Sequence, residues 1–347
     1  MNIAESKKIL EIEGIDQPLL IDHDRMKFLW SLSLEEKEQY IESSILQFWE
    51  KMNGKVYQAH SHGLDSIILE EYLRQFSVKY TVPAIPKFYI NTTNEFPSIL
   101  EAARADENTT VLTSEHTFKN VVEKHGFPMI SKRWARAINT LRHPSEKNKN
   151  IRNLFLTGYN RNGQYSKRWI LPKIWKHLID APFDISDKCC NYLKHGGLEK
   201  YANKCGLCPY VGTLADDSQT RKDNYQKHGC NILQGKQPKS RPLSILKTNE
   251  RLTVVNKYNL KINSIYQDVV INGEIIKGEH NTGCADCDFG LYFELRDPQD
   301  RYYRQWKRNP RFYLYGMDGI KNNGVTRREA LRYVGFIPPD ERQKTIW

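Results

Sequence analysis

The chain has 347 residues, which is enough for about two domains or for one large domain with extensions. Apolar residues make up 39% of it and charged residues 27%, and no stretch approaches the roughly 18 uninterrupted apolar residues of a membrane-spanning helix, which excludes a transmembrane protein. A formal net charge of +11 makes a polyanion, a nucleotide or a nucleic acid a reasonable partner.

The first residues predict the compartment. Residues 1–14 carry acids early and no apolar core long enough for a signal peptide, so we expect a cytoplasmic protein. That compartment keeps thiols reduced, and the seven cysteines therefore predict metal or redox chemistry rather than disulfides. Their spacing is a vicinal pair, a C-x-x-C, a lone cysteine and a second C-x-x-C, at Cys189, Cys190, Cys205, Cys208, Cys230, Cys284 and Cys287.

Apolar side chains alternate between helical and strand spacing along the first 130 residues. The helix at 31–51 begins near Ser33, a suitable N-cap. In order, the pattern predicts a helix at 31–51, a strand at 55–60, a helix at 67–76, a strand at 82–90, a helix at 96–104, a strand at 110–113 and a helix at 116–125. This alternation predicts a parallel sheet with helical crossovers.

The rest of the chain has a weaker pattern. We expect residues 131–179 to be mostly helical around a solvated loop at 144–153. Further predictions are strands at 210–214 and 243–246, a polar helix from Ser218 and a mixed tail from Asn249. We therefore divide the chain into a helical N-terminal extension, a nucleotide-binding domain and a C-terminal unit, at 1–53, 54–248 and 249–347.

The segment Ser61-His62-Gly63-Leu64-Asp65-Ser66 joins a predicted strand directly to a helix. Such a turn presents backbone N–H groups and hydroxyls at the positive end of a helix dipole, which suits a phosphate. Gly63 lets the backbone approach an anion, Ser61 and Ser66 can donate hydrogen bonds, and Asp65 can cap the helix or help to hold a metal-bound phosphate. An ordinary capped turn explains the same spacing.

The loop resembles the PP-loop, usually Ser-Gly-Gly-x-Asp-Ser, of the ATP pyrophosphatase superfamily, and its surroundings resemble the phosphoadenosine phosphosulfate (PAPS) reductase family in that superfamily. The resemblance spans roughly 33–336. The other segments that carry it, in order, are Gly54–Tyr57, Thr93–Pro97, Gly126–Lys132, Lys188–Lys194, Gly212–Arg221 and Thr282–Gly290.

This resemblance implies an α/β fold with a parallel-sheet, Rossmann-like core of the adenine nucleotide alpha hydrolase type. It also implies a bound adenine nucleotide, either ATP or PAPS/APS, with Mg²⁺ on its phosphates. The implied catalytic residues are Asp65, Lys194 and Arg221. The implied nucleotide-binding residues are Ser61, His62, Gly63, Leu64, Asp65, Ser66, Thr92, Glu95, Lys132, Gly212, Asp217, Ser218 and Arg221.

His62 departs from the family pattern, because it occupies a position that is normally glycine. Its side chain is expected to crowd the phosphate cradle, and a positive φ there would be strained. The imidazole could instead donate to a phosphate. A degenerate loop that binds nucleotide without catalysis is the alternative.

Cys189, Cys190, Cys284 and Cys287 resemble the ligand set of a 4Fe-4S cluster in the adenosine phosphosulfate reductase subgroup. A Zn²⁺ site is the alternative metal, and small buried thiols without a ligand are the third interpretation. Cys205 and Cys208 match nothing in the family. They could complete a zinc site with Cys230 or His228, or form a redox pair, but we expect them to be separate thiols. Cys230 is expected to be structural.

Several basic and acidic side chains are candidates for anion binding. Lys194 follows Cys190 by one helical turn and can direct its ammonium at the thiolates. Arg221 can join Ser218 and Lys132 in holding phosphate or sulfate oxygens, although each could be a solvated surface charge. Glu95 and Asp217 could bind ribose hydroxyls or magnesium, and helix capping explains both almost as well.

The tail segment 296–311 interleaves arginines with Tyr302, Tyr303 and Trp306. Such a mixture can stack bases and contact phosphates, so DNA or tRNA is a candidate partner. An amphipathic helix that packs its aromatic side on the core is the interpretation we favour.

The sequence is compatible with three functions. The first is a PAPS or APS reductase that releases sulfite, but the attacking cysteine that the family carries near its C-terminus has no counterpart after Cys287. The second, which we favour, splits ATP between its α- and β-phosphates and activates a substrate such as a nucleic acid for sulfur insertion. The third is a non-catalytic nucleotide sensor. A sulfur donor or thioredoxin-like protein is a further expected partner, and analogy with phage-borne relatives suggests DNA modification or defence.

Overall fold

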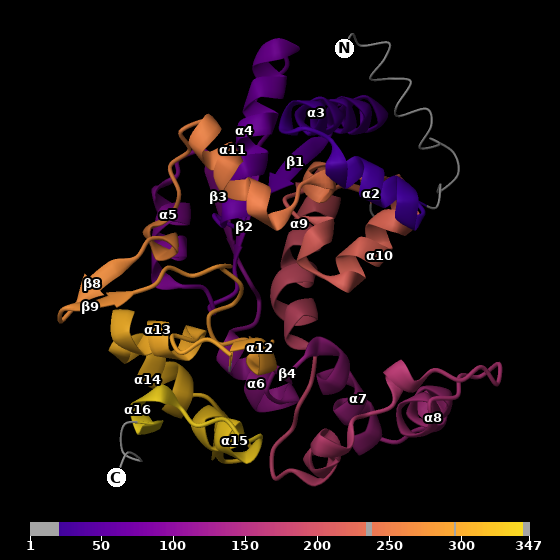
Figure 1. Cartoon of the computed structure of the whole chain (residues 1–347), viewed down its shortest axis with the longest axis vertical. Helices are drawn as coiled ribbons and strands as arrows, with labels where there is room; N and C mark the ends of the chain where they lie inside the picture. Colours follow the sequence, from indigo (N-terminus) through magenta and orange to yellow (C-terminus); the bar gives the residue numbers. More distant parts are fainter. Residues whose placement is uncertain (1–20, 234–237, 295, 343–347) are drawn as a thin grey trace. The chain divides into compact units, whose positions relative to one another are not determined.

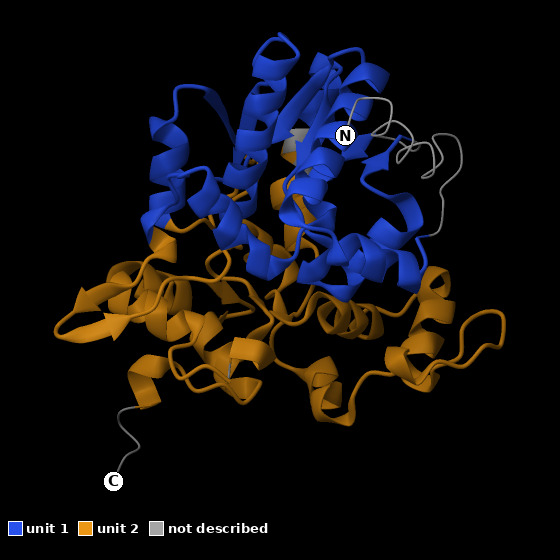
Figure 2. Cartoon of the chain, turned by 45° about the horizontal axis from the view of Figure 1, so that its top comes forward, with its two compact units in different colours: residues 1–91, 97–113, 198–264 blue, residues 92–96, 114–197, 265–347 orange. Residues whose placement is uncertain are grey.

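A computed structural model describes residues 21–233, 238–294 and 296–342, which form two compact units that alternate along the chain (Figure 2). Unit 1 comprises 1–91, 97–113 and 198–264, and unit 2 comprises 92–96, 114–197 and 265–347. Both of the segments expected at 54–248 and 249–347 therefore contribute to both units. Residues 1–20 of the expected extension and 343–347 of the expected tail lie outside the described residues.

Unit 1 is built on a six-stranded sheet with the order β3-β2-β1-β5-β7-β6. Figure 1 labels β1, β2 and β3 of this sheet. Its first four strands and β7 run parallel, and β6 is antiparallel to β7. The expected α/β fold with a mainly parallel sheet is confirmed. The strands are β1 (Val56–Ala59), β2 (Lys87–Asn91), β3 (Thr109–Thr113), β5 (Cys208–Val211), β6 (Asn231–Ile232) and β7 (Lys239–Ser240).

The helices of unit 1 follow the apolar periodicity of the sequence. The side chain of Ser33 accepts from Glu36 N in a capping box, so α3 begins where the sequence predicts. Helix α4 buries Leu69, Leu73 and Phe76. The helices are α2 (His23–Ser31), α3 (Leu34–Lys51), α4 (Leu64–Lys79), α5 (Pro97–Ala105), α10 (Gln219–His228) and α11 (Arg251–Lys257), with α9 (Gly196–Cys205) on the chain between the units.

Unit 2 is mainly helical around one apolar core that includes Phe127, Phe155, Leu178 and Tyr313. Its short strands pair as β4 with β10, β8 with β9 and β11 with β12. The elements are α6 (Phe118–His125), β4 (Met129–Ile130), α7 (Lys132–Arg142), α8 (Lys149–Thr157), β8 (Val269–Ile271), β9 (Glu274–Ile276), β10 (Asp288–Phe289), α12 (Leu291–Glu294), α13 (Arg301–Arg308), α14 (Pro310–Asp318), β11 (Lys321–Asn322), β12 (Val325–Thr326), α15 (Arg327–Tyr333) and α16 (Pro339–Arg342).

Three sequence predictions of local structure are wrong. The expected strand at 243–246 lies in a 3₁₀ helix, Pro242–Ile245, because proline at its first position fixes φ and removes a donor. The expected loop at 144–153 contains the first half of α8, which Gly158 ends in a left-handed C-cap. The strand expected at 82–90 begins only at Lys87, because the prolines before it cannot donate to a ladder.

Within the described residues, every helix is too short or too polar to cross a lipid bilayer.

Candidate functional site

The carboxyl ends of β1 and β5 meet where the strand order of unit 1 reverses. From β1 the chain moves through β2 to β3 on one side, and β5 lies on the other side. Open α/β sheets bind ligands in the crevice at such a switch point. The segment 60–63 follows β1 and Gly212 follows β5, so both reach this position.

The expected phosphate loop is held by its own serines. The Ser66 hydroxyl accepts from Ser61 N at 3.1 Å and lies 2.8 Å from the Ser61 hydroxyl. Gly63 is the N-cap of the 16-residue α4 in an extended conformation, and no side chain caps that helix. Gly63 N donates to the Ser61 hydroxyl at 3.4 Å, so a serine oxygen already occupies an acceptor position at the positive end of the α4 dipole.

Gly212 explains how tightly β5 packs against this loop. A Cβ atom on Gly212 would lie 2.7 Å from Asp65 O and 3.1 Å from Ser66 N. Only glycine allows this approach of two backbones. The sequence-predicted Gly212 thus belongs to the same corner as Asp65 and Ser66.

His62 adopts the positive φ expected of the glycine position, at 52°. Its ring packs edge-on against His60, with centroids 4.2 Å apart, and against Tyr89 of β2 at 5.6 Å. The side chain is 7% exposed, and Nε2 has no hydrogen-bond partner. The imidazole therefore packs on Tyr89 of β2, the neighbour of β1 on the side opposite β5, and its effect on a bound phosphate stays a prediction.

The pKa of His62 is lowered to about 4, mainly by burial and secondly by the charge of the nearby His60. The ring is therefore neutral at physiological pH.

Three charged side chains, Glu70, Lys87 and Asp106, form a network that ends at His60, the residue before the loop. His60 Nε2 lies 3.1 Å from Glu70 Oε2, and Lys87 Nζ lies 2.5 Å from Glu70 and from Asp106. Burial opposes ionisation of Glu70, but hydrogen bonds from His60 and Lys87 outweigh it and lower its pKa to about 2. The sequence analysis did not find this network, because its members are far apart in the sequence.

Arginines gather near the first turn of α4. Arg251 Nη1 lies 3.2 Å from Asp65 Oδ1, and Arg221 forms an ion pair with Asp217. Burial raises the pKa of Asp65, and Arg251 opposes that rise. Ser218 caps α10 by accepting from Arg221 N. Leu64, the first residue of α4, is buried.

Arg241 was missed by the sequence analysis. It follows β7, whose Ser240 is paired with Tyr210 of β5, so it lies at the same edge of the sheet as Gly212. Burial and the neighbouring Arg221 lower its pKa, and it forms no ion pair with any acid in the described parts of the chain. Its position directly between a short strand and Pro242 was the available signal.

Thr92, Glu95 and Lys132 belong to unit 2. Glu95 accepts from Thr92 N at 3.1 Å, from the Thr92 hydroxyl at 2.5 Å and from Asn94 N at 3.1 Å. This carboxylate therefore closes a local turn before α5, and its partners are residues that precede the helix rather than amides of the helix itself. Lys132 is exposed at the start of α7, after the N-cap Ser131.

The four cysteines expected to form one ligand set are neighbours in unit 2. Cys189 hydrogen-bonds Cys190 and interacts electrostatically with Cys284 and Cys287. The exposed Lys194 hydrogen-bonds Cys284, whose charge is the main cause that raises the pKa of this lysine. Burial raises the pKa of Cys284 and of Cys287, and Lys194 opposes that rise at Cys284.

Buried side chains hold the Cys284–Cys287 loop. Arg327, 1% exposed, donates to Asp286 at 2.7 Å and to Asp288 at 2.6 Å. The Tyr302 hydroxyl donates to Asp288 at 2.7 Å, and Gln305 Nε2 donates to Ala285 O at 2.7 Å. The loop is therefore fixed by α13 and α15.

The thiol set matches an iron–sulfur cluster in chemistry, because four thiolates ligate a 4Fe-4S cluster and Lys194 would offset part of their charge. A single zinc ion needs its ligands at about 2–2.3 Å in a tetrahedron. Across 21–233, 238–294 and 296–342, no group of three His, Cys, Asp or Glu side chains is arranged to hold a metal ion.

The other three cysteines lie in unit 1. Cys205 is exposed at the end of α9, Cys208 begins β5, and Cys230 is buried with its Sγ 3.9 Å from Pro242 O. Cys230 therefore packs as a structural side chain.

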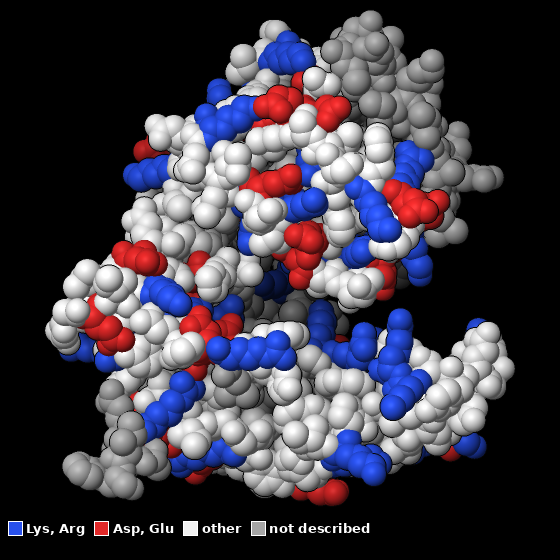
Figure 3. Space-filling view, viewed as in Figure 1, with Lys and Arg blue, Asp and Glu red and all other residues white. Residues whose placement is uncertain are grey.

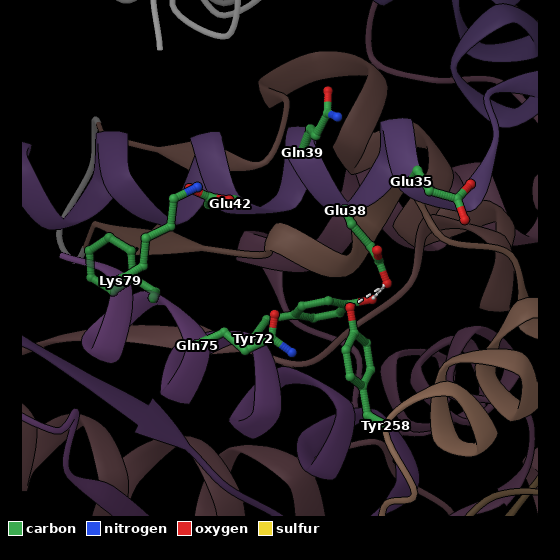
Figure 4. A pocket seen from close by; sticks show the side chains of 9 residues that line it. Glu35, Glu38, Gln39, Glu42, Tyr72, Gln75, Lys79 and Tyr258 are labelled. Carbon is green, nitrogen blue, oxygen red and sulfur yellow. Dashed lines mark hydrogen bonds and ion pairs between the residues drawn. The ribbon is translucent and has the colours of Figure 1, made fainter. Parts of the chain in front are cut away.

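A groove of about 320 Å³ lies between α3, α4 and Tyr258, at the opposite end of α4 from the loop (Figure 4). Two of the three acids that line it, Glu38 and Glu42, are already engaged. Glu38 accepts from Tyr258 at 2.9 Å and from Tyr72 at 3.2 Å, and Glu42 accepts from Lys79 at 2.5 Å. We assign no ligand to this groove.

The basic aromatic segment 296–311 contains α13 and the first two residues of α14, and its aromatic side chains are buried or half-buried. Arg304, 2% exposed, pairs with Glu279 at 2.7 Å, and Tyr302 is 1% exposed. Lys307 pairs with Glu274 at 3.3 Å. The amphipathic-helix interpretation is confirmed, and this segment is a poor surface for a nucleic acid.

No family model matches this sequence, and no curated protein matches it. Among solved structures, the chain is similar to a crystal structure of phosphoadenylyl-sulfate (PAPS) reductase from Candida auris in complex with phosphate. The identity is 11% and the TM-score 0.36, over 70% of this chain and 90% of that chain. A superposition this loose assigns neither an activity nor a ligand to this chain.

Proposed function

We propose that this chain is an adenine-nucleotide-binding enzyme of sulfur chemistry that splits ATP between its α- and β-phosphates to activate a substrate for sulfur insertion. The placement of the loop at 61–66 carries the proposal. It joins a parallel strand to the uncapped start of α4 where the strand order reverses, against the backbone of Gly212.

The side chains around the loop suit a triphosphate. In the proposed complex a phosphate oxygen replaces the Ser61 hydroxyl as the acceptor of the Gly63 amide, the first turn of α4 adds the positive end of its dipole, and Ser61 adds an exposed hydroxyl. Arg241 supplies a positive charge that no described acid neutralises. Arg251 holds the Asp65 carboxylate, which would supply an oxygen ligand to the magnesium ion that ATP brings with it.

The proposed step is a displacement at the α-phosphorus. An oxygen of the substrate forms a bond to this phosphorus, and the bond from phosphorus to the bridging α–β oxygen breaks. Pyrophosphate leaves with the electron pair, and its charge is stabilised by the loop amides and arginines. A sulfur nucleophile from a donor then displaces AMP from the activated carbon.

We further propose that Cys189, Cys190, Cys284 and Cys287 hold a 4Fe-4S cluster, with Lys194 beside Cys284. When bound, such a cluster supplies electron transfer or an iron atom that binds sulfur. Anaerobic reconstitution should give about four irons per chain. Cys190→Ser should lose this iron and Cys205→Ser should keep it, whereas a colourless protein with one tightly bound zinc would contradict the assignment.

Product analysis tests the main proposal. Purified protein with ATP, Mg²⁺, a sulfur donor and candidate acceptors should release AMP and pyrophosphate. Release of ADP and phosphate would contradict it. Sulfite from PAPS with thioredoxin would favour the reductase alternative, and nucleotide binding without any product would favour the sensor.

A further inference from the structure

The positive charge of the chain is concentrated in one part of unit 2. Residues 131–180 contain twelve Lys and Arg and two Asp and Glu, a net +10 out of the +11 of the whole chain. Figure 3 shows Lys and Arg gathered over the region of α7 and α8, with few acids among them. We call the exposed side chains of residues 131–180 the basic surface.

Most of these basic side chains form no ion pair with an acid of the described chain. Of the twelve bases, Arg142 alone pairs with an acid of the described chain, Asp184 at 3.1 Å, and it also donates to backbone carbonyls. The others that matter here are exposed: Lys132, Arg133, Arg136, Lys147, Lys149, Arg161, Lys167 and Arg168. A solvated face of this charge repels itself, so an anionic partner would stabilise it.

A small hairpin carries aromatic side chains out of the same surface. Tyr159 and Tyr165 face each other across an antiparallel bridge, with ring centroids 5.1 Å apart, and they are 48% and 56% exposed. Asn160 orders the turn between them, because its side chain accepts from Asn162 N and Gln164 N. The hairpin therefore presents Arg161 and two tyrosines in one fixed arrangement.

Arginine and tryptophan are also interleaved. The guanidinium of Arg133 lies 5.1 Å and that of Arg168 lies 5.3 Å from the ring centroid of Trp169. Planar guanidinium groups held on an aromatic ring can stack on bases as well as contact phosphates.

We propose that the basic surface binds unpaired nucleotides of a nucleic acid, with the lysines and arginines on the phosphates and with Tyr159 and Tyr165 stacked on bases. Duplexes hide their base faces, whereas exposed aromatics on a basic surface fit single strands or RNA loops. The identification of this nucleic acid as the substrate of the sulfur insertion rests on the proposed function. The binding itself needs no ATP.

Fluorescence anisotropy with labelled oligonucleotides of about 20 nucleotides tests the proposal, and oligo(dT), oligo(U) and a DNA duplex are the three probes. We expect both single strands to bind more tightly than the duplex. Affinity for a single strand should fall with salt between about 50 and 200 mM, with a log–log slope of about −0.7 per phosphate contact. The ratio of the oligo(U) and oligo(dT) affinities then indicates RNA or DNA as the partner.

Two variants separate charge from stacking. The triple variant Lys149→Gln, Arg161→Gln, Lys167→Gln should flatten the salt slope by about 2. A control of equal charge in unit 1, Lys51→Gln, Lys204→Gln, Lys227→Gln, should leave binding unchanged. Tyr165→Leu should weaken single-strand binding by about fivefold or more, and Tyr165→Phe should retain it.

Three outcomes would overturn the proposal: no binding of a single strand at about 50 mM salt, equal loss of binding in the two triple variants, or a duplex preferred with no effect of Tyr165→Leu. All binding is measured without ATP, so failure here is distinguishable from absence of pyrophosphate release. Thermal unfolding by circular dichroism shows that each variant is folded.

Discussion

The loop at 61–66 in unit 1 is held by hydrogen bonds among its own residues, whereas the Cys284–Cys287 loop in unit 2 is held by buried side chains from α13 and α15. The first loop lies at the start of α4, which no side chain caps, and at the same edge of the sheet as Arg241. The second fixes its thiols through Arg327, which is fully enclosed. The difference teaches that an anion site can stay locally supported, while a thiol set has to be positioned by distant parts of the fold.

The largest effect should come from the buried ion pairs of unit 2. Arg327→Met leaves Asp286 and Asp288 without their partner and should lower the free energy of unfolding by about 3–5 kcal/mol, measured by chemical denaturation. The matched variant Arg221→Met removes a pair whose arginine side chain is 45% exposed and should cost about 1 kcal/mol or less. Similar losses in both variants would remove the contrast between the two loops.

Arg241→Met should have the next largest effect, on nucleotide binding rather than on stability. A charge-assisted hydrogen bond is worth about 1.5–3 kcal/mol, so the Kd of ATP should rise by about tenfold or more in calorimetric titration. Arg104→Met, which removes an exposed arginine on α5, is the control and should leave the Kd unchanged. An unchanged Kd in Arg241→Met would exclude this arginine from the phosphate site.

Lys87→Met tests the charges beneath the loop through pH. Burial opposes the charge of Glu70, but the hydrogen bonds that Glu70 makes with His60 and Lys87 lower its pKa to about 2. The stabilisation of the fold by these hydrogen bonds is therefore present above pH 4.5, the ordinary pKa, and is lost as pH falls from 4.5 to about 2. The difference in unfolding temperature between the wild-type protein and Lys87→Met should therefore shrink across that range. A difference in unfolding temperature that does not change with pH would contradict this assignment.

His62→Gly should have the smallest effect. Because burial lowers the pKa of His62 from 6.5 to about 4, the unfolded chain takes up a proton more readily, and His62 destabilises the fold as pH falls from 6.5 to 4. The glycine variant should lose this part of the pH dependence of stability, and glycine should adopt the positive φ at this position without strain. Its ATP affinity should change less than that of Arg241→Met, and a larger change would show that the imidazole contacts the nucleotide.

The sequence predicted the elements whose signals are local. The cap at Ser33, the turn at 61–66 and the alternation up to residue 125 are short-range patterns, and the helices and the parallel strands follow them. It also predicted that the four cysteines are neighbours, through the resemblance, and that Lys194 lies beside them, through its spacing of one helical turn from Cys190. Their functions stay predictions.

The rest depends on contacts between distant residues. Arg241 reaches the site only because β7 pairs with β5, and the role of Arg327 depends on carboxylates about forty residues earlier in the chain. The direction of the His62 ring was also hidden, because it depends on Tyr89 of the next strand. Residue spacing does not encode these contacts.

A crystal structure with an ATP analogue that has a non-cleavable α–β bridge would test the central claim most directly. We predict phosphate density against the amides of Gly63 and the first turn of α4, beside Gly212 and within reach of Arg241. Phosphates bound elsewhere, or a loop at 61–66 that stays closed on its own serines at saturating nucleotide, would contradict it.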